Sequence, residues 1–105
     1  MKASELLEII GDKYSAEILR VLHRRELNAI DIIRNTKIPP GVVYRKIHTL
    51  KNAGLIEIAG RPLTSANKRI WVFKSTIKAS HIYYDGAKLK ITIEKISGQK
   101  LSFED

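Results

Sequence analysis

The strongest constraint on the fold of this chain is a change of hydrophobic periodicity at Gly54. Before this glycine, apolar residues recur every three or four positions, the spacing that gives a helix one apolar face. After it, short runs rich in β-branched and aromatic residues are typical of strands. The 105 residues are enough for one modest hydrophobic core. We therefore expect an α+β fold with the helices first and the strands after them.

Four helices are predicted before Gly54, at about residues 4–10, 13–25, 29–36 and 40–53. Asp12 and Asn28 are the expected N-caps of the second and third helices, because their side-chain oxygens can accept hydrogen bonds from free helical N–H groups. Pro39 and Pro40 open the fourth, since the first turn of a helix does not need the missing N–H of proline.

Two hairpins are predicted after Gly54. In the first, strands at residues 55–58 and 69–74 flank a polar loop, residues 59–68, that contains glycine and proline. The second hairpin joins strands at residues 76–84 and 88–96.

For the second hairpin we predict a three-residue loop rather than a two-residue Asp-Gly turn, which would mix polar and apolar residues on each face. The expected pairs on one face are Tyr83 with Leu89, His81 with Ile91, and Ala79 with Ile93.

The predicted elements divide the chain into three parts. Residues 1–75 are the main domain, the hairpin at 76–96 packs on it or dimerises it, and the polar residues 97–105 are a flexible tail.

The positive charge of the chain is concentrated in its middle. Residues 27–74 carry nine basic and two acidic side chains, whereas the segments on either side are close to neutral. A polyanion is the expected partner of such a surface, and a merely solvated lysine-rich surface is the alternative. Because no long apolar run or signal peptide is present, we expect a cytoplasmic protein without membrane contact.

The predicted fourth helix has two different faces. At about 100° per residue, Val43, Ile47 and Leu50 fall in one narrow arc and are expected to face the core. Arg45 and His48 lie on the opposite side and are expected to face solvent.

The segment Ile38–Ile56 resembles the recognition helix and first wing strand of ArsR- and MarR-like regulators. It shares with them an Arg near the middle of the helix and the run Ala-Gly-Leu-Ile after it. The resemblance covers about residues 5–75 and implies a winged helix-turn-helix with an extra C-terminal β-hairpin. The chain departs from the family pattern at Pro39-Pro40, where a Ser or Thr cap is usual, and at Lys37, often a Gly.

The resemblance implies a sequence-specific regulator that binds double-stranded DNA. The recognition helix then offers to a major groove the following residues: Pro40, Gly41, Val42, Tyr44, Arg45 and His48. Arg61, Lys68 and Arg69, at or beside the tip of the wing, are expected to contact the DNA backbone. Trp71 and Phe73 are expected in the core rather than as base-stacking platforms.

A homodimer is expected, because such a small protein otherwise has little reason to carry an extra apolar hairpin. Its predicted interface combines the first helix with the terminal hairpin, through Leu6, Leu7, Ile10, Tyr83, Leu89, Ile91 and Ile93. The alternative is that the hairpin folds back and caps the core of its own chain.

No catalytic, metal or cofactor site is expected. The chain has no cysteine, and its three histidines lack metal-ligand spacing, so neither a thiolate site nor a histidine pair is available. No serine has a nearby base, and no phosphate-binding loop is present. Two other functions remain open at this point: a winged-helix adaptor for another protein, and a non-specific RNA or chromatin binder.

Overall fold

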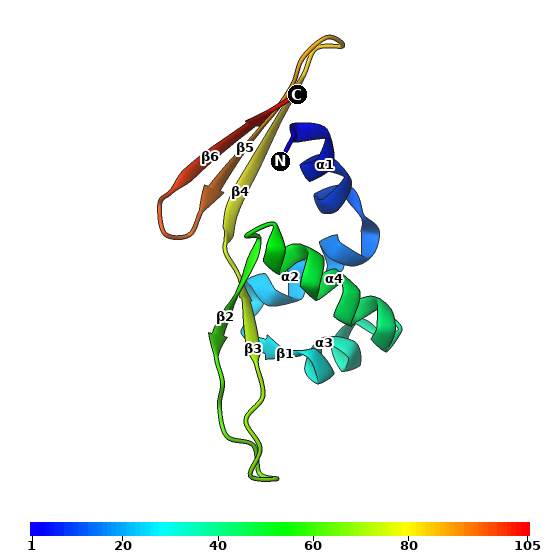
Figure 1. The fold of residues 1–105 in the computed structure, drawn as a ribbon, viewed down its shortest axis with the longest axis vertical. Coiled ribbons are helices and arrows are strands. Elements are labelled where there is room, and N and C mark those ends of the chain that lie inside the picture. Colours follow the sequence, from blue (N-terminus) through cyan, green and yellow to red (C-terminus); the bar gives the residue numbers. More distant parts are fainter.

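The computed structural model describes all residues, 1–105, and shows the predicted α+β architecture. The helices are α1 (Ala3–Gly11), α2 (Lys13–Arg24), α3 (Ala29–Thr36) and α4 (Pro40–Asn52). The strands are β1 (Leu27–Asn28), β2 (Ile56–Gly60), β3 (Val72–Ser75), β4 (Ile77–Tyr84), β5 (Leu89–Lys95) and β6 (Lys100–Glu104). The hairpin β2–β3 projects from one end of the molecule, and the sheet of β4, β5 and β6 lies at the other (Figure 1).

The helix boundaries follow from local hydrogen bonding. Asp12 Oδ2 accepts a bond from the Ser15 N–H at 2.9 Å, and Asn28 Oδ1 accepts one from the Asp31 N–H at 2.8 Å, which confirms both predicted caps. Helix α4 begins at Pro40, as expected. Lys37 ends α3 in the left-handed conformation (φ 59°), at the position where the resemblance suggested a glycine.

The first sheet has the order β1-β3-β2, and its β2–β3 hairpin forms the wing. Strand β1 was not predicted, since a two-residue strand has no periodicity to detect; in it Leu27 pairs with Phe73. The strand β3 begins only at Val72, later than predicted. Phe73 is buried as expected, but the prediction for Trp71 is wrong: it lies before the strand, beyond the core, and is 48% exposed.

The second sheet has the order β4-β5-β6, and its hairpin register differs by one residue from the prediction. Tyr84 pairs with Leu89, Ile82 with Ile91, and Ser80 with Ile93. Because side chains alternate between faces, this shift places Tyr83, His81 and Ala79 on the face opposite the one predicted.

The cause of the shift is the loop. The Asp85 carboxylate accepts hydrogen bonds from the N–H groups of Ala87 and Lys88, at 2.9 and 2.7 Å. These bonds close a loop from Asp85 to Lys88, one residue longer than predicted.

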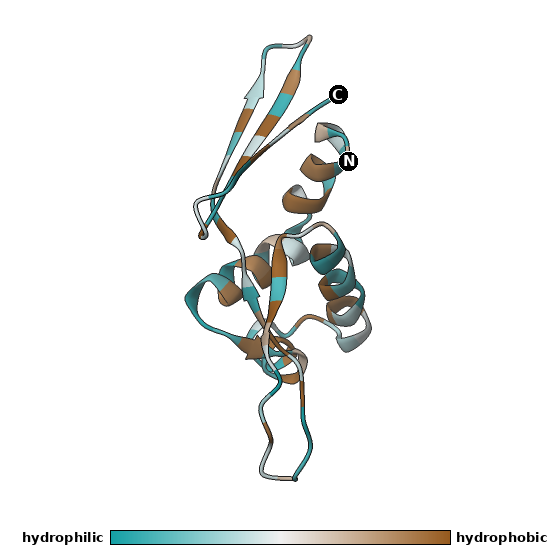
Figure 2. Ribbon diagram, turned by 60° about the vertical axis from the view of Figure 1, so that its left-hand side comes forward, coloured by the Kyte–Doolittle hydropathy of each residue, from teal (hydrophilic) through white to brown (hydrophobic).

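The expected flexible tail at residues 97–105 is also wrong, because residues 100–104 form β6. Gly98 turns the chain in a conformation with φ 93°, and Leu101 and Phe103 then pair with Ile93 and Ile91. The segment is polar on average, yet its alternation gives it one apolar face. Figure 2 shows the same alternation of hydrophobic and hydrophilic residues along β5.

Helix α1 packs on this second sheet, against β5 and β6. Leu6, Ile91 and Ile93 are fully buried within one chain, so the prediction that they form a dimer interface is wrong. The alternative holds for them: the C-terminal segment folds back and extends the core of its own chain. Of the other residues predicted for that interface, Leu7 and Tyr83 are exposed, and Ile10 and Leu89 are half-buried.

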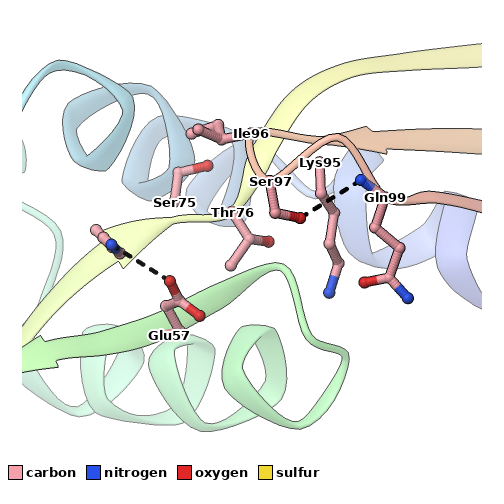
Figure 3. A pocket seen from close by; sticks show the side chains of 8 residues that line it. Glu57, Ser75, Thr76, Lys95, Ile96, Ser97 and Gln99 are labelled. Atoms are coloured by element: carbon pink, nitrogen blue, oxygen red, sulfur yellow. Dashed lines mark hydrogen bonds and ion pairs between the residues drawn. The ribbon is translucent and has the colours of Figure 1, made fainter.

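Thr76 joins the two sheets. Its hydroxyl donates to the Gly54 carbonyl at 2.8 Å, its N–H donates to the Leu55 carbonyl, and its own carbonyl accepts from Ile96. A polar cleft of about 420 Å³ lies at this junction, where the Lys95 side chain and the Glu57–Lys74 ion pair (3.4 Å) line its walls (Figure 3).

Because α4 is part of the core, truncation of one of its buried side chains should destabilise the protein. Leu50 is fully buried, so Leu50→Ala should lower the free energy of unfolding by about 2–5 kcal/mol through lost burial and a residual cavity. Leu63→Ala is the matched control, because this leucine of the wing is 56% exposed. Urea unfolding followed by circular dichroism measures both, and equal losses would contradict the packing described.

Candidate nucleic-acid interface

Helix α4 is oriented by three buried side chains. Val43, Ile47 and Leu50 all belong to the hydrophobic core, as the periodicity predicted. The opposite face carries Arg45 and His48, both exposed. The burial on one side therefore turns a polar stripe of α4 toward solvent.

An ion pair fixes α4 to the start of α2. Lys46 Nζ lies 3.3 Å from Asp12 Oδ2, the same carboxylate that caps α2. The Ser15 N–H, and after it Lys46, hold the pKa of Asp12 below its usual value, because both favour the charged carboxylate. Asp12 thus stabilises one helix and positions another.

The exposed face of α4 contains five of the six residues predicted for this helix: Pro40, Gly41, Tyr44, Arg45 and His48. Gly41 has open space where a Cβ would stand, so the backbone there is accessible to a partner. The sixth, Val42, is half-buried and packs against the core. Its side chain is therefore only partly available at the surface.

The three basic wing residues, Arg61, Lys68 and Arg69, are all exposed. Two of them are held by neighbours. The Arg61 guanidinium lies over the Trp71 ring, 4.6 Å from its centroid, and Arg69 Nη1 donates to the Arg61 carbonyl at 3.1 Å. The aromatic ring that the sequence analysis assigned to the core instead supports a wing arginine.

The exposed stripe of α4 and the wing belong to one surface. Tyr44, Ile47 and Trp71 line two adjoining clefts between α4 and the wing strands, of about 350 and 270 Å³. The larger cleft also includes Arg69, and the smaller one includes His48. A ligand that lies along α4 therefore also meets the base of the wing.

The cations of this surface are free of acidic partners. Within residues 27–74, ion pairs engage Arg34, Lys46 and Lys74. The six other basic residues are exposed and form no ion pair: Lys37, Arg45, Lys51, Arg61, Lys68 and Arg69. They lie on α4, on the wing, and on the turn before α4, so the excess charge collects around the exposed stripe. Lys37 and Lys51 were missed as site residues, although the charge count of the segment included both.

Comparison with known families agrees with this geometry. Residues 14–57 match the family model of the bacterial regulatory proteins of the arsR family. The match runs from α2 through α4 into β2 and supports a helix-turn-helix of ArsR type, and with it DNA binding in transcription regulation. The MarR-like alternative receives no such support. No curated protein matches the chain.

No group of three His, Asp or Glu side chains is placed to hold a metal ion. None of the helices has the length and apolar character needed to cross a bilayer.

The dual role of Asp12 predicts a pH-dependent contribution to stability. Because folding lowers the pKa of Asp12, its contribution is present above the usual value of 3.8 and is lost as the pH falls through the folded pKa. Asp12→Ala should cost about 1 kcal/mol at neutral pH by removing the cap. Asp12→Asn keeps an acceptor and should cost less.

Thermal unfolding between pH 7 and pH 3 measures both effects. In either variant the loss of stability on acidification should be smaller than in the wild type. If Asp12→Ala is as stable as the wild type at neutral pH, the assigned cap and ion pair are contradicted.

Proposed function

We propose that this protein is a homodimeric transcription regulator that binds specific sequences of double-stranded DNA in the cytoplasm, without catalytic activity or cofactor. The observation that carries the proposal is the exposed polar stripe of α4, which shares one unpaired cationic surface with the wing. The arsR family match over residues 14–57 supports the same function.

In this proposal α4 enters a major groove, which is wide enough for one helix. Arg45 is exposed near the middle of α4 and can form two hydrogen bonds with a guanine edge. Tyr44 and His48 flank it and can bond to bases or phosphates. The N-terminus of α4, at Pro40 and Gly41, favours a phosphate through its free N–H groups and helix dipole.

The wing contributes affinity rather than sequence information. Arg61, Lys68 and Arg69 are placed to contact phosphates beside the groove that α4 occupies. The stacking on Trp71 restricts Arg61 before DNA arrives, so less side-chain entropy is lost on binding.

A homodimer would place two copies of α4 in successive major grooves, with half-sites about 34–36 Å apart. This arrangement predicts a palindromic operator. Leu7 and Tyr83, the exposed members of the interface predicted from the sequence, remain available for it.

Two substitutions separate base reading from backbone contact. Arg45→Ala should lower affinity for the preferred site by about 1–3 kcal/mol and relax the preference at one base pair. Lys68→Ala should weaken all duplexes about equally and reduce the salt dependence by about 0.9 in the slope of log K against log salt. Selection from random duplexes, followed by gel shifts in a salt series, measures both.

The same experiment tests the other two functions. A protein-interaction adaptor would show no salt-sensitive retention of any duplex, and charge reversal at Arg45 and Arg61 would leave its partner binding intact. A non-specific binder would retain unrelated sequences equally. A uniform loss of affinity from Arg45→Ala would overturn its base-reading role.

Trp71 provides an independent readout of the wing, because it is the only tryptophan of the chain. It lies in the clefts between α4 and the wing, so its fluorescence should change when a duplex covers this surface. Unchanged emission, while the anisotropy of a labelled duplex rises, would show that DNA binds elsewhere.

A further inference from the structure

The outer part of β4 is unusually open. All five residues from Ser80 to Tyr84 are exposed, and they include three large hydrophobic side chains, Ile82 at 51%, Tyr83 at 56% and Tyr84 at 69% exposure. β4 is an edge strand, so its outer main-chain groups have no partner in the sheet. A long, apolar, unpaired edge is a template for pairing with another strand.

We propose that Ser80–Tyr84 pairs antiparallel with the same segment of a second copy of this chain, forming one continuous sheet of six strands. The proposal deepens the homodimer of the proposed function by naming its surface, which differs from the interface predicted from the sequence. The pairing itself does not depend on DNA.

The hydrogen-bond pattern between β4 and β5 shows which main-chain groups of β4 are free to pair with another strand. Asp85 N donates to the Lys88 carbonyl at 3.3 Å, and hydrogen-bonded pairs then recur at every second residue of an antiparallel hairpin. The main-chain N–H and C=O groups of the odd-numbered residues of β4 therefore point toward β5. Ser80, Ile82 and Tyr84 turn theirs toward the open edge.

The same three residues lie on the apolar face of the sheet, the face that α1 covers. They pair with Ile93, Ile91 and Leu89 respectively, and α1 packs over β5 and β6 but leaves the outer part of β4 uncovered. A two-fold axis perpendicular to the sheet pairs even-numbered residues with even-numbered ones. It therefore keeps both copies of Ile82 and Tyr84 on one face, where they cover each other.

Charge complementarity also favours a second copy as the occupant. In antiparallel pairing centred on His81 or on Ile82, Lys78 of one chain stands one residue from the position opposite Asp85 of the other. Opposite charges thus lie near each other at both ends of the paired segment, where Lys78 also forms an ion pair with Glu94 of its own chain at 3.6 Å. A register shift at Lys78 ends the regular strand there, which limits the pairing to the outer part.

The other edge of the sheet, β6, is less suited to pairing. It is five residues long and carries Lys100 and Glu104 at its ends. Asp105 just beyond it accepts a hydrogen bond from the Ser4 N–H of α1 at 2.8 Å. Charged ends and a covering helix are the usual protections of an edge strand.

Pairing through β4 leaves the proposed DNA surface free. The second sheet lies at the end of the molecule opposite the wing (Figure 1). The paired segment is short, and the interface is expected at the small end of the range for specific complexes. The dimer should therefore dissociate on dilution.

The test is a matched pair of proline substitutions. Ser80→Pro removes an N–H that faces the open edge of β4, whereas Ser102→Pro removes one that faces the open edge of β6. Both serines are exposed, and neither N–H is needed within the chain. Circular dichroism and thermal unfolding verify that both variants fold.

Sedimentation of the full chain without DNA, from low micromolar to submillimolar concentration, measures the result. The wild type and Ser102→Pro should dimerise, and Ser80→Pro should raise the dissociation constant by about tenfold or more, since both copies lose the bond. Amide exchange gives a second readout. The N–H groups of Ser80, Ile82 and Tyr84 should exchange more slowly as the concentration rises.

A wild type that stays monomeric at every concentration, or a dimer lost in Ser102→Pro but not in Ser80→Pro, overturns the proposal. A dimer of unchanged strength in Ser80→Pro does the same. These results are distinct from a failure of the proposed DNA binding. A monomer that binds specific duplex DNA contradicts this inference and the homodimer but not the DNA surface, and a β4-paired dimer that retains no DNA contradicts only the regulator.

Discussion

The burial of one side of α4 in the core decides which of its side chains face solvent. Val43, Ile47 and Leu50 bury one side of the helix in the common core, and the Lys46–Asp12 pair holds it against α2. Since a helix has only one opposite side, Arg45 and His48 must then point outward. The hydrophobic effect thus determines which polar groups the protein offers to a partner.

The surface formed by α4 and the wing is separated in space from the second sheet. β3 and β4 are almost continuous, and Thr76 bonds between them to Gly54, Leu55 and Ile96. The wing then lies at one end of the molecule and the apolar sheet at the other (Figure 1). Contacts made by one end therefore need not obstruct the other.

Much of the helical part could be predicted from the sequence, because its signals are local. A capping side chain such as Asp12 or Asn28 acts within three residues, and the spacing of Val43, Ile47 and Leu50 is read directly from the chain. The charge imbalance of residues 27–74 was also visible. The sequence could not show which of these cations are unpaired, because that depends on which acidic side chains lie close to them in the structure.

The strands were less predictable because their contacts are distant or depend on a single side chain. The loop that the Asp85 carboxylate holds is one residue longer than predicted. This difference exchanges the two faces of β4 relative to the prediction. β6 has a polar composition, and only its pairing with β5 reveals an apolar face. Trp71 shares the wing with Phe73, yet it lies just before β3 and remains 48% exposed.

The most direct test of the account is a nuclear magnetic resonance titration of the ¹⁵N-labelled protein with a selected duplex. If α4 and the wing bind the duplex, the largest amide shifts fall on Gly41, Arg45, His48 and residues 61–69, whereas the amides of β6 stay in place. Shifts confined to the second sheet, with α4 and the wing unchanged, would contradict it.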